Sequence, residues 1–193
     1  MISPSQSESI GSPQCGQVIF DLRDARTGEV LEHWEKHNLV TLDSGILSGR
    51  LFKNTELPVS GRNNGMNMMG VGTGGFTLLN TTRHLEIELI RKAFNSVTYV
   101  DPGGAPSAVP TRAVNFEAVF GAAEAIGALN EMCLMYTADL NPAVTNPIMN
   151  GPYGYDPTID VSGKDILANY ICWDPPSVKP PATILTVNWI VKW

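Results

Sequence analysis

The sequence is poor in the features that mark membrane insertion, export and nucleic-acid binding. No apolar run approaches the ~18 residues that a membrane-spanning helix needs, and the opening MISPSQSESIGSPQ lacks the basic and apolar regions of a signal peptide. The 13 basic and 19 acidic residues are scattered, for a net charge of -6, with no Lys/Arg run to neutralise phosphates. We therefore expect a chain that is used without export, and whose partners include neither nucleic acid nor a membrane.

Cysteine is also scarce. Cys15, Cys133 and Cys172 are an odd number at wide spacing, which fits neither a disulfide framework nor a C-x-x-C metal site. We expect reduced thiols, two of them buried among apolar neighbours. With 193 residues, 43% of them hydrophobic, the chain is long enough for one well-packed domain but short for two.

The N-terminal segment is rich in Ser, Pro, Gln and Gly and nearly free of apolar side chains, so burial cannot offset the entropy of ordering it. This composition predicts an extended arm over residues 1–16, followed by a single domain over 17–193. The arm has two alternative destinations: it docks on a neighbouring subunit, or it folds back on its own domain. In the first case its contacts would come from Ser3, Pro4, Ser5, Gln6 and Pro13.

A second segment, residues 139–163, holds four prolines and three glycines, too many for a helix or a central strand. We predict a long loop here. A loop of this length inside a compact domain usually makes contacts of its own. The residues expected to make them are Pro147, Tyr153 and Tyr155.

Most of the remaining sequence alternates apolar and polar residues, as strands do. Residues 17–40 predict a hairpin with Gly28 in its turn, 111–120 and 129–138 predict further strands, and 182–193 predicts a closing strand inside a sheet. The fold class that follows is mainly β: an antiparallel β-sandwich or jelly-roll-like domain. One face of the closing strand would carry Thr183, Leu185, Val187, Trp189, Val191 and Trp193.

We expect one or two short helices beside the strands. Residues 41–54 space their leucines and isoleucine as a helix does, behind Asp43 or Ser44 as a cap. The segment TTRHLEIELIRKAF, residues 81–94, fits both a helix and a strand. We predict a helical turn there that breaks into a strand at residues 95–100.

Gly70, Gly72 and Gly75 have the G-x-G-x-x-G spacing of a dinucleotide-binding loop. That loop needs a buried strand before the first glycine and a helix after the last one, so that the pyrophosphate rests on the helix N-terminus. Here a polar stretch, RNNGMNMM, precedes the glycines and FTLLNTT follows them. We therefore predict a crowded backbone turn between a long loop and the next element, and no bound cofactor.

The sequence also lacks the residue arrangements that metal binding and enzymatic catalysis require. His33 and His37 would lie roughly 13 Å apart on a strand, too far for one metal ion. Ser48 is not in a G-x-S-x-G turn, and the pair Glu86 and Glu88 would serve glycosidic chemistry only inside a cleft. We expect no metal and no enzymatic activity.

Taken in order, the segments MGVGTGG, TTRHLEIELIR, AVNFEAVF, ALNEMCLMY, LANYICWD and TILTVNWIVKW resemble a widespread group of tailed-bacteriophage virion proteins. In that group an xGxGT segment precedes a Thr-x-x-Leu-x-x-Glu-x-x-Arg element, here Thr82, Leu85, Glu88 and Arg91. The resemblance runs from about Gly28 to the end of the chain. The motif residues to which it assigns structural roles are Gly70, Gly72, Thr73, Gly74, Leu85, Glu88 and Arg91.

The resemblance implies a non-enzymatic tail, neck or fibre-anchoring protein of the virion, assembled in the host cytoplasm. Its partners would be other copies of itself and other phage structural proteins. A capsid decoration (cement) protein is the alternative, and a nucleotide-binding or hydrolytic enzyme is a remote third. Structurally, we expect an i, i+3 ion pair between Glu88 and Arg91, with Thr81 or Thr82 as a cap.

The sequence departs from the group at one motif. The group continues Glu-x-Gly-Leu in the second strand, whereas here Glu131 is followed by Met132, Cys133 and Leu134. The close backbone approach that a glycine allows is therefore in question at Cys133.

Overall fold

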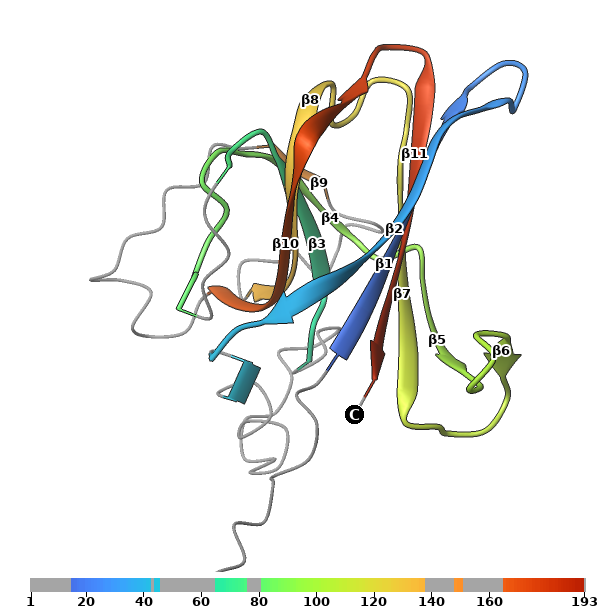
Figure 1. Ribbon diagram of the computed structural model, residues 1–193, viewed down its shortest axis with the longest axis vertical. Helices are drawn as coiled ribbons and strands as arrows, with labels where there is room; N and C mark the ends of the chain where they lie inside the picture. Colours follow the sequence, from blue (N-terminus) through green and yellow to red (C-terminus); the bar gives the residue numbers. More distant parts are fainter. Residues whose placement is uncertain are drawn as a thin grey trace, which may run out of the picture.

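A computed structural model describes residues 15–42, 44–45, 65–75, 81–137, 148–150 and 165–192 (Figure 1). Two sets of predicted contacts lie outside these ranges. They are the arm residues Ser3, Pro4, Ser5, Gln6 and Pro13, and the loop residues Pro147, Tyr153 and Tyr155.

The strands form one 11-stranded sheet in the order β6-β5-β7-β11-β1-β2-β10-β8-β3-β4-β9. All of its neighbouring strands pair antiparallel. In chain order they are β1 Cys15–Asp24, β2 Val30–Val40, β3 Met68–Gly72, β4 Glu88–Ala93, β5 Ser96–Val100, β6 Pro106–Ser107, β7 Ala113–Phe120, β8 Gly127–Thr137, β9 Ile148–Asn150, β10 Asp165–Lys179 and β11 Thr183–Lys192.

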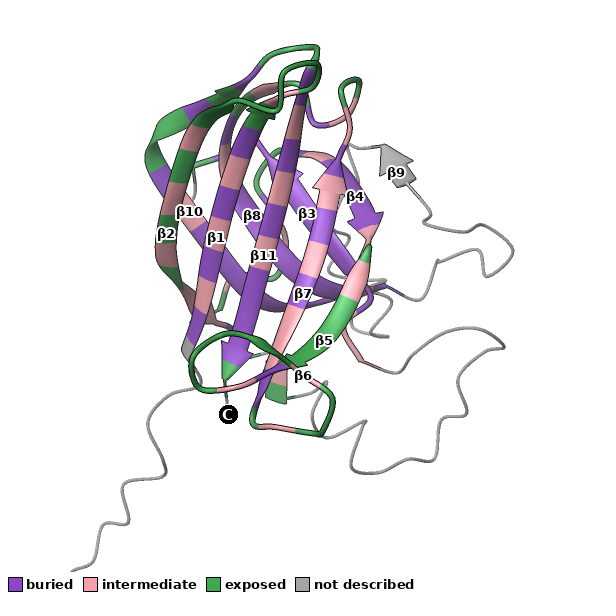
Figure 2. Cartoon of the chain, turned by 90° about the vertical axis from the view of Figure 1, so that its right-hand side faces the viewer, coloured by how far each residue is buried: buried purple, intermediate pink, exposed green. Residues whose placement is uncertain are grey.

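The sheet folds over on itself into two facing layers (Figure 2). The layer with β7, β11, β1 and β2 faces the layer with β10, β8, β3 and β4, and β2 joins β10 only through Leu39 and Val40. Apolar side chains from both layers, such as Val18, Trp189 and Leu134, form one buried core between them. The prediction of a mainly antiparallel β fold is confirmed. The finer assignment of the fold as a β-sandwich or a jelly roll stays a prediction, because both layers belong to one continuous sheet.

The closing strand, β11, shows why the alternation of apolar and polar residues predicted strands well. In β11 the side chains of Leu185, Val187 and Trp189 are fully buried, and the intervening ones are half-buried on the other face. β11 lies between β7 and β1, as expected for a strand inside a sheet. β1 begins at Cys15, so the predicted boundary between arm and domain falls two residues late.

Where β2 and β10 diverge, aromatic rings fill the space between them. Trp34 stacks on Phe20 with centroids 4.7 Å apart, and on Trp173 at 5.0 Å with a tilt. The Ser177 hydroxyl accepts hydrogen bonds from both indole N–H groups, at 3.2 Å and 3.0 Å, and donates to Glu32 at 2.5 Å. The two layers are thus held together along this side without strand pairing.

The structure corrects the helix predictions. Residues 81–87 form turns and bends, and β4 begins directly at Glu88, so the predicted helical turn over 81–94 is wrong. Pairing with β3 buries β4, and this tertiary contact outweighs the local helical spacing. Of the helix predicted over 41–54, only Ser44 and Gly45 are described as helical. Within the described ranges no helix is long and apolar enough to cross a membrane.

Two buried lysines hold the layers together beside the turn between β7 and β8. Lys92 of β4 donates to the Val119 carbonyl at 2.7 Å and to the Glu124 carboxylate at 2.8 Å. Lys179 of β10 donates to the carbonyls of Gly121 and Thr183, each at 2.9 Å. Burial lowers the pKa of Lys179. These contacts join strands of opposite layers through charge-assisted hydrogen bonds.

The stability contributed by Glu124 should depend on pH. Burial raises the pKa of Glu124, but hydrogen bonds from Lys92 and the Gly121 amide outweigh that effect and lower it below the ordinary 4.5. Since the folded state then binds the proton more weakly than the unfolded state, this stability is present at neutral pH and is lost as the pH falls below about 4.5. Urea unfolding of wild type and Glu124→Gln should therefore differ at pH 7 and converge in acid. A difference that stays constant with pH would contradict this interpretation.

Candidate functional site

The glycine stretch lies in a strand. Gly70 and Gly72 belong to β3, whose residues are all buried, so the predicted backbone turn is wrong at these two positions. β3 runs between β4 and β8, and the register places Gly72 beside Glu88 and Glu131. Sequence reasoning missed this strand because the polar stretch before the glycines lacks the run of apolar residues that predicts a buried strand.

The crowding predicted at the glycines is confirmed. A Cβ on Gly72 would lie 2.4 Å from the Ile87 carbonyl oxygen and 2.5 Å from Oε1 of Glu131. A Cβ on Gly74 would lie 2.3 Å from Cβ of Glu86. Residues 85–87 therefore cross the face of β3 so closely that no side chain fits at Gly72 or Gly74.

The Glu131 carboxylate fixes that crossing. Glu131 is fully buried on β8, and its Oε1 accepts hydrogen bonds from the amides of Gly74 at 2.9 Å and Ile87 at 2.8 Å. Its Oε2 accepts from the Glu86 amide at 2.9 Å and from the Tyr170 hydroxyl at 3.3 Å. Backbone N–H groups thus compensate the buried charge and tie two segments to one strand.

Glu88 and Arg91 form the predicted ion pair, on a strand instead of a helix. Both side chains are almost wholly buried, and Arg91 donates to the two carboxylate oxygens of Glu88 at 2.5 Å and 2.8 Å. Residues i and i+3 of a regular strand point to opposite faces. Here Val71 pairs with Ile90 and Gly72 with Glu88, so Leu89 is the extra residue of a β-bulge. The bulge brings both charged side chains to one face.

Apolar side chains enclose these polar groups. Leu85 packs with Met68, Cys133 and Tyr170 in a second cluster, separate from the main core. A Cβ on Gly70 would lie 3.0 Å from Sγ of Cys133 and 3.2 Å from Leu85. The close approach at Cys133 is therefore made by Gly70, which pairs with it from the neighbouring strand β3.

The structure brings the predicted motif residues together. Thr73 joins them through its amide, which donates to the Ile87 carbonyl at 3.0 Å. No helix follows, so the predicted capping role of Thr81 or Thr82 is wrong. Sequence reasoning missed the central position of Glu131, whose only signal was its place in the Asn-Glu strand motif.

This cluster offers no activated nucleophile. Burial raises the pKa of the Cys133 thiol, that of the Cys172 thiol and that of the Tyr170 hydroxyl. Raised pKa values keep these groups protonated near neutral pH, and a thiol attacks only as the thiolate. The arrangement can hold a backbone in place.

The histidines are separated by the fold. His33 lies on the outer face of β2 beside Asp21, at 2.9 Å, whereas Nδ1 of His37 lies 3.3 Å from the Gly16 carbonyl. His84 contacts the Leu85 carbonyl at 2.7 Å. Over the described part of the chain, no group of three or more His, Cys, Asp or Glu could hold a metal ion.

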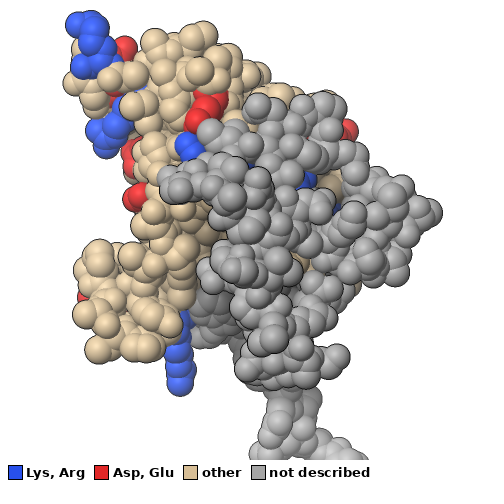
Figure 3. Space-filling view, turned by 180° about the vertical axis from the view of Figure 1, so that it is seen from behind, with Lys and Arg blue, Asp and Glu red and all other residues tan. Residues whose placement is uncertain are grey.

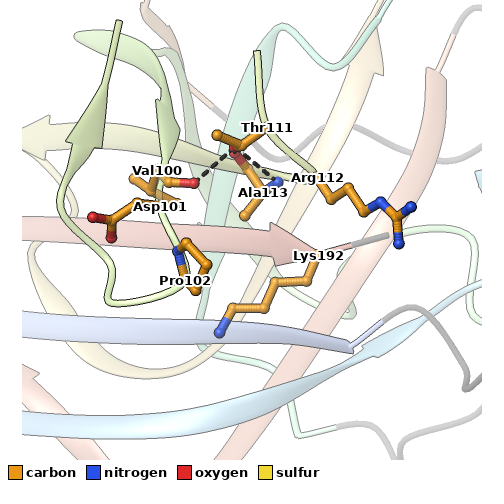
Figure 4. Close-up of a pocket in the computed structure, with 7 residues that line it drawn as sticks. All are labelled: Val100, Asp101, Pro102, Thr111, Arg112, Ala113 and Lys192. Carbon is orange, nitrogen blue, oxygen red and sulfur yellow. Dashed lines mark hydrogen bonds between the residues drawn. The ribbon is translucent and has the colours of Figure 1, made fainter. Parts of the chain in front are cut away.

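An open hollow of about 270 Å³ lies beside β5, β7 and β11 (Figure 4). The Thr111 hydroxyl contacts the carbonyls of Val100 at 2.7 Å and Ala113 at 2.9 Å, so it is committed to the backbone. The hollow is lined by Val100, Asp101, Pro102, Thr111, Arg112, Ala113 and Lys192.

Comparison of the chain with protein-family models, with curated proteins and with solved structures gives no match.

We predict that Gly72 cannot accept a side chain. Gly72→Ala would push a methyl group into the Ile87 carbonyl and the Glu131 carboxylate, and should lower the free energy of unfolding by about 1–3 kcal/mol. Gly75→Ala is the matched control, because its Cβ would meet only Asn130, at an ordinary 3.5 Å. Urea unfolding of both variants checks this, and equal losses would contradict it.

Glu131→Gln tests the carboxylate itself. An amide keeps the shape but turns a donor group toward backbone donors, so we expect a loss of roughly 2–4 kcal/mol in the free energy of unfolding. Glu117→Gln on the outer face of β7 is the control and should change stability by less than about 0.5 kcal/mol. The role assigned to Glu131 is wrong if the two variants unfold at the same urea concentration.

Proposed function

We propose that this chain is a non-enzymatic structural component of a tailed-bacteriophage particle, a tail, neck or fibre-anchoring protein that assembles as symmetric copies. The proposal starts from the resemblance in the sequence. The observation that carries it is the convergence of the resembling residues. These residues lie in adjoining buried contacts: Gly70, Leu85 and Glu88 meet beside Cys133, Glu88 pairs with Arg91, and Gly72 and Gly74 lie against Glu131.

This convergence supports a structural role, because a motif that meets only in a buried cluster serves the fold. A dinucleotide would need the glycine backbone free for its pyrophosphate. At Gly72 and Gly74 that space is filled by residues 86–87 and by Glu131. The glycines therefore favour a packing function over a phosphate-binding one.

The proposal is tested by the position and copy number of this chain in purified particles. Cryo-electron microscopy and quantitative mass spectrometry should find a closed ring of a few to about a dozen copies in the tail or neck. Hundreds of copies on the shell would instead support the capsid decoration alternative. Absence of the chain from intact particles, or a thermal shift with nucleotides that Gly72→Ala abolishes, would contradict the proposal.

A further inference from the structure

A lobe projects from the folded sheet at β5 and β6 (Figure 1). Its residues, 96–111, include one charged side chain, Asp101, in a chain whose net charge is -6. In the view from behind, the lobe at the lower left is almost wholly free of acidic and basic atoms (Figure 3). Two acidic chains repel one another, so an uncharged lobe is where copies can approach.

The edge of β5 lacks the usual protection against pairing. The free part of the β2 edge carries the charged residues Glu32, Glu35 and Lys36, and that of β10 carries Pro175 and Pro176. Charges and prolines of this kind discourage edge-to-edge association. β5, in contrast, reads SVTYV. β6 covers it only at Tyr99 and Val100, which leaves residues 96–98 uncovered by any described strand on that side.

The backbone of Val97 points out of this free edge. The Asp101 amide donates to the Ala105 carbonyl at 2.8 Å, which places the peptide groups of Asp101 on the β6 side of the strand. Backbone groups alternate between the two edges of a strand. The N–H and C=O groups of Tyr99 and Val97 therefore also point to the β6 side. At Val97 these groups lie beyond the end of β6.

The side chains on this strand are also unusually exposed. Val97 is 52% exposed and Tyr99 is 41% exposed, on the face that Phe116 shares. Both residue types pair well across strands.

We propose that a second copy of this chain pairs antiparallel with β5, around a two-fold axis at Val97. The Val97 N–H of each copy donates to the Val97 carbonyl of the other, and Ser96 lies opposite Thr98. Only this centre uses the three free residues without displacing β6. The contact is isologous, so each residue contributes twice.

This inference adds a two-fold contact, which joins copies in pairs, to the proposed symmetric assembly, and so it rests on that part of the proposed function. The two can fail separately. Self-association of the purified chain without a place in a particle would contradict the proposed function alone. A chain found in particles but monomeric in solution would contradict the β5 contact alone.

The test is sedimentation velocity on the full chain and on charge variants of Val97. A two-fold axis places each substituted residue opposite itself, so Val97→Lys and Val97→Glu should each weaken self-association by about tenfold or more through like-charge repulsion. An equimolar mixture of the two variants should restore association, since Lys then lies opposite Glu. A residue with a merely structural role would not show this rescue.

Val178→Lys is the matched control, because Val178 is 64% exposed on β10 and should leave association unchanged. Should the charged variants fold poorly by circular dichroism, Val97→Cys replaces them. Paired Cα atoms about 5.5 Å apart allow a disulfide between copies, which Val178→Cys should not form. The proposal is overturned if wild type stays monomeric up to on the order of 100 µM. It is equally overturned if the mixture does not restore association, or if Val97→Cys does not cross-link under oxidation.

Discussion

A single buried carboxylate determines how this chain crosses its own glycine strand. Glu131 can be buried because the amides of Gly74, Glu86 and Ile87 surround it. The same bonds draw residues 85–87 over β3 so closely that Gly72 must remain a glycine. Burying a carboxylate is costly unless hydrogen bonds compensate the charge. The buried carboxylate therefore requires both the backbone amides that bind it and the glycines that let those amides come close.

The other contacts that hold the fold together lie elsewhere in the molecule. Between the layers, apolar packing of Phe20, Trp34 and their neighbours replaces strand pairing where β2 and β10 diverge. Two lysines and Glu124 join the layers beside the turn between β7 and β8. Outside the core, β5 carries no charged residue, and we propose that it contacts a second copy of the chain. This division agrees with a subunit whose chemistry serves assembly, as we propose.

Strands that have one face in the core and the other face outside could be predicted from the sequence. β1, β2, β7 and β11 alternate between more and less buried side chains, and period-two patterns revealed them. β8 was also predicted as a strand, although its residues 131–135 are all buried. β3 is buried on both faces and has no alternation, and β4 has its pattern broken by the bulge at Leu89. The ion pair of Glu88 and Arg91 could be predicted from local spacing. The Glu131 contacts could not, because they join residues 44 to 57 positions apart.

Glu131 holds residues 85–87 against the glycine stretch and leaves no open loop at Gly72 and Gly74. Amide hydrogen exchange at Gly74, Glu86 and Ile87, followed by nuclear magnetic resonance, tests it most directly. Because a buried carboxylate holds these amides, we predict that they exchange only when the domain unfolds, as slowly as the core strands. Exchange at these three amides as fast as in exposed loops would contradict the account.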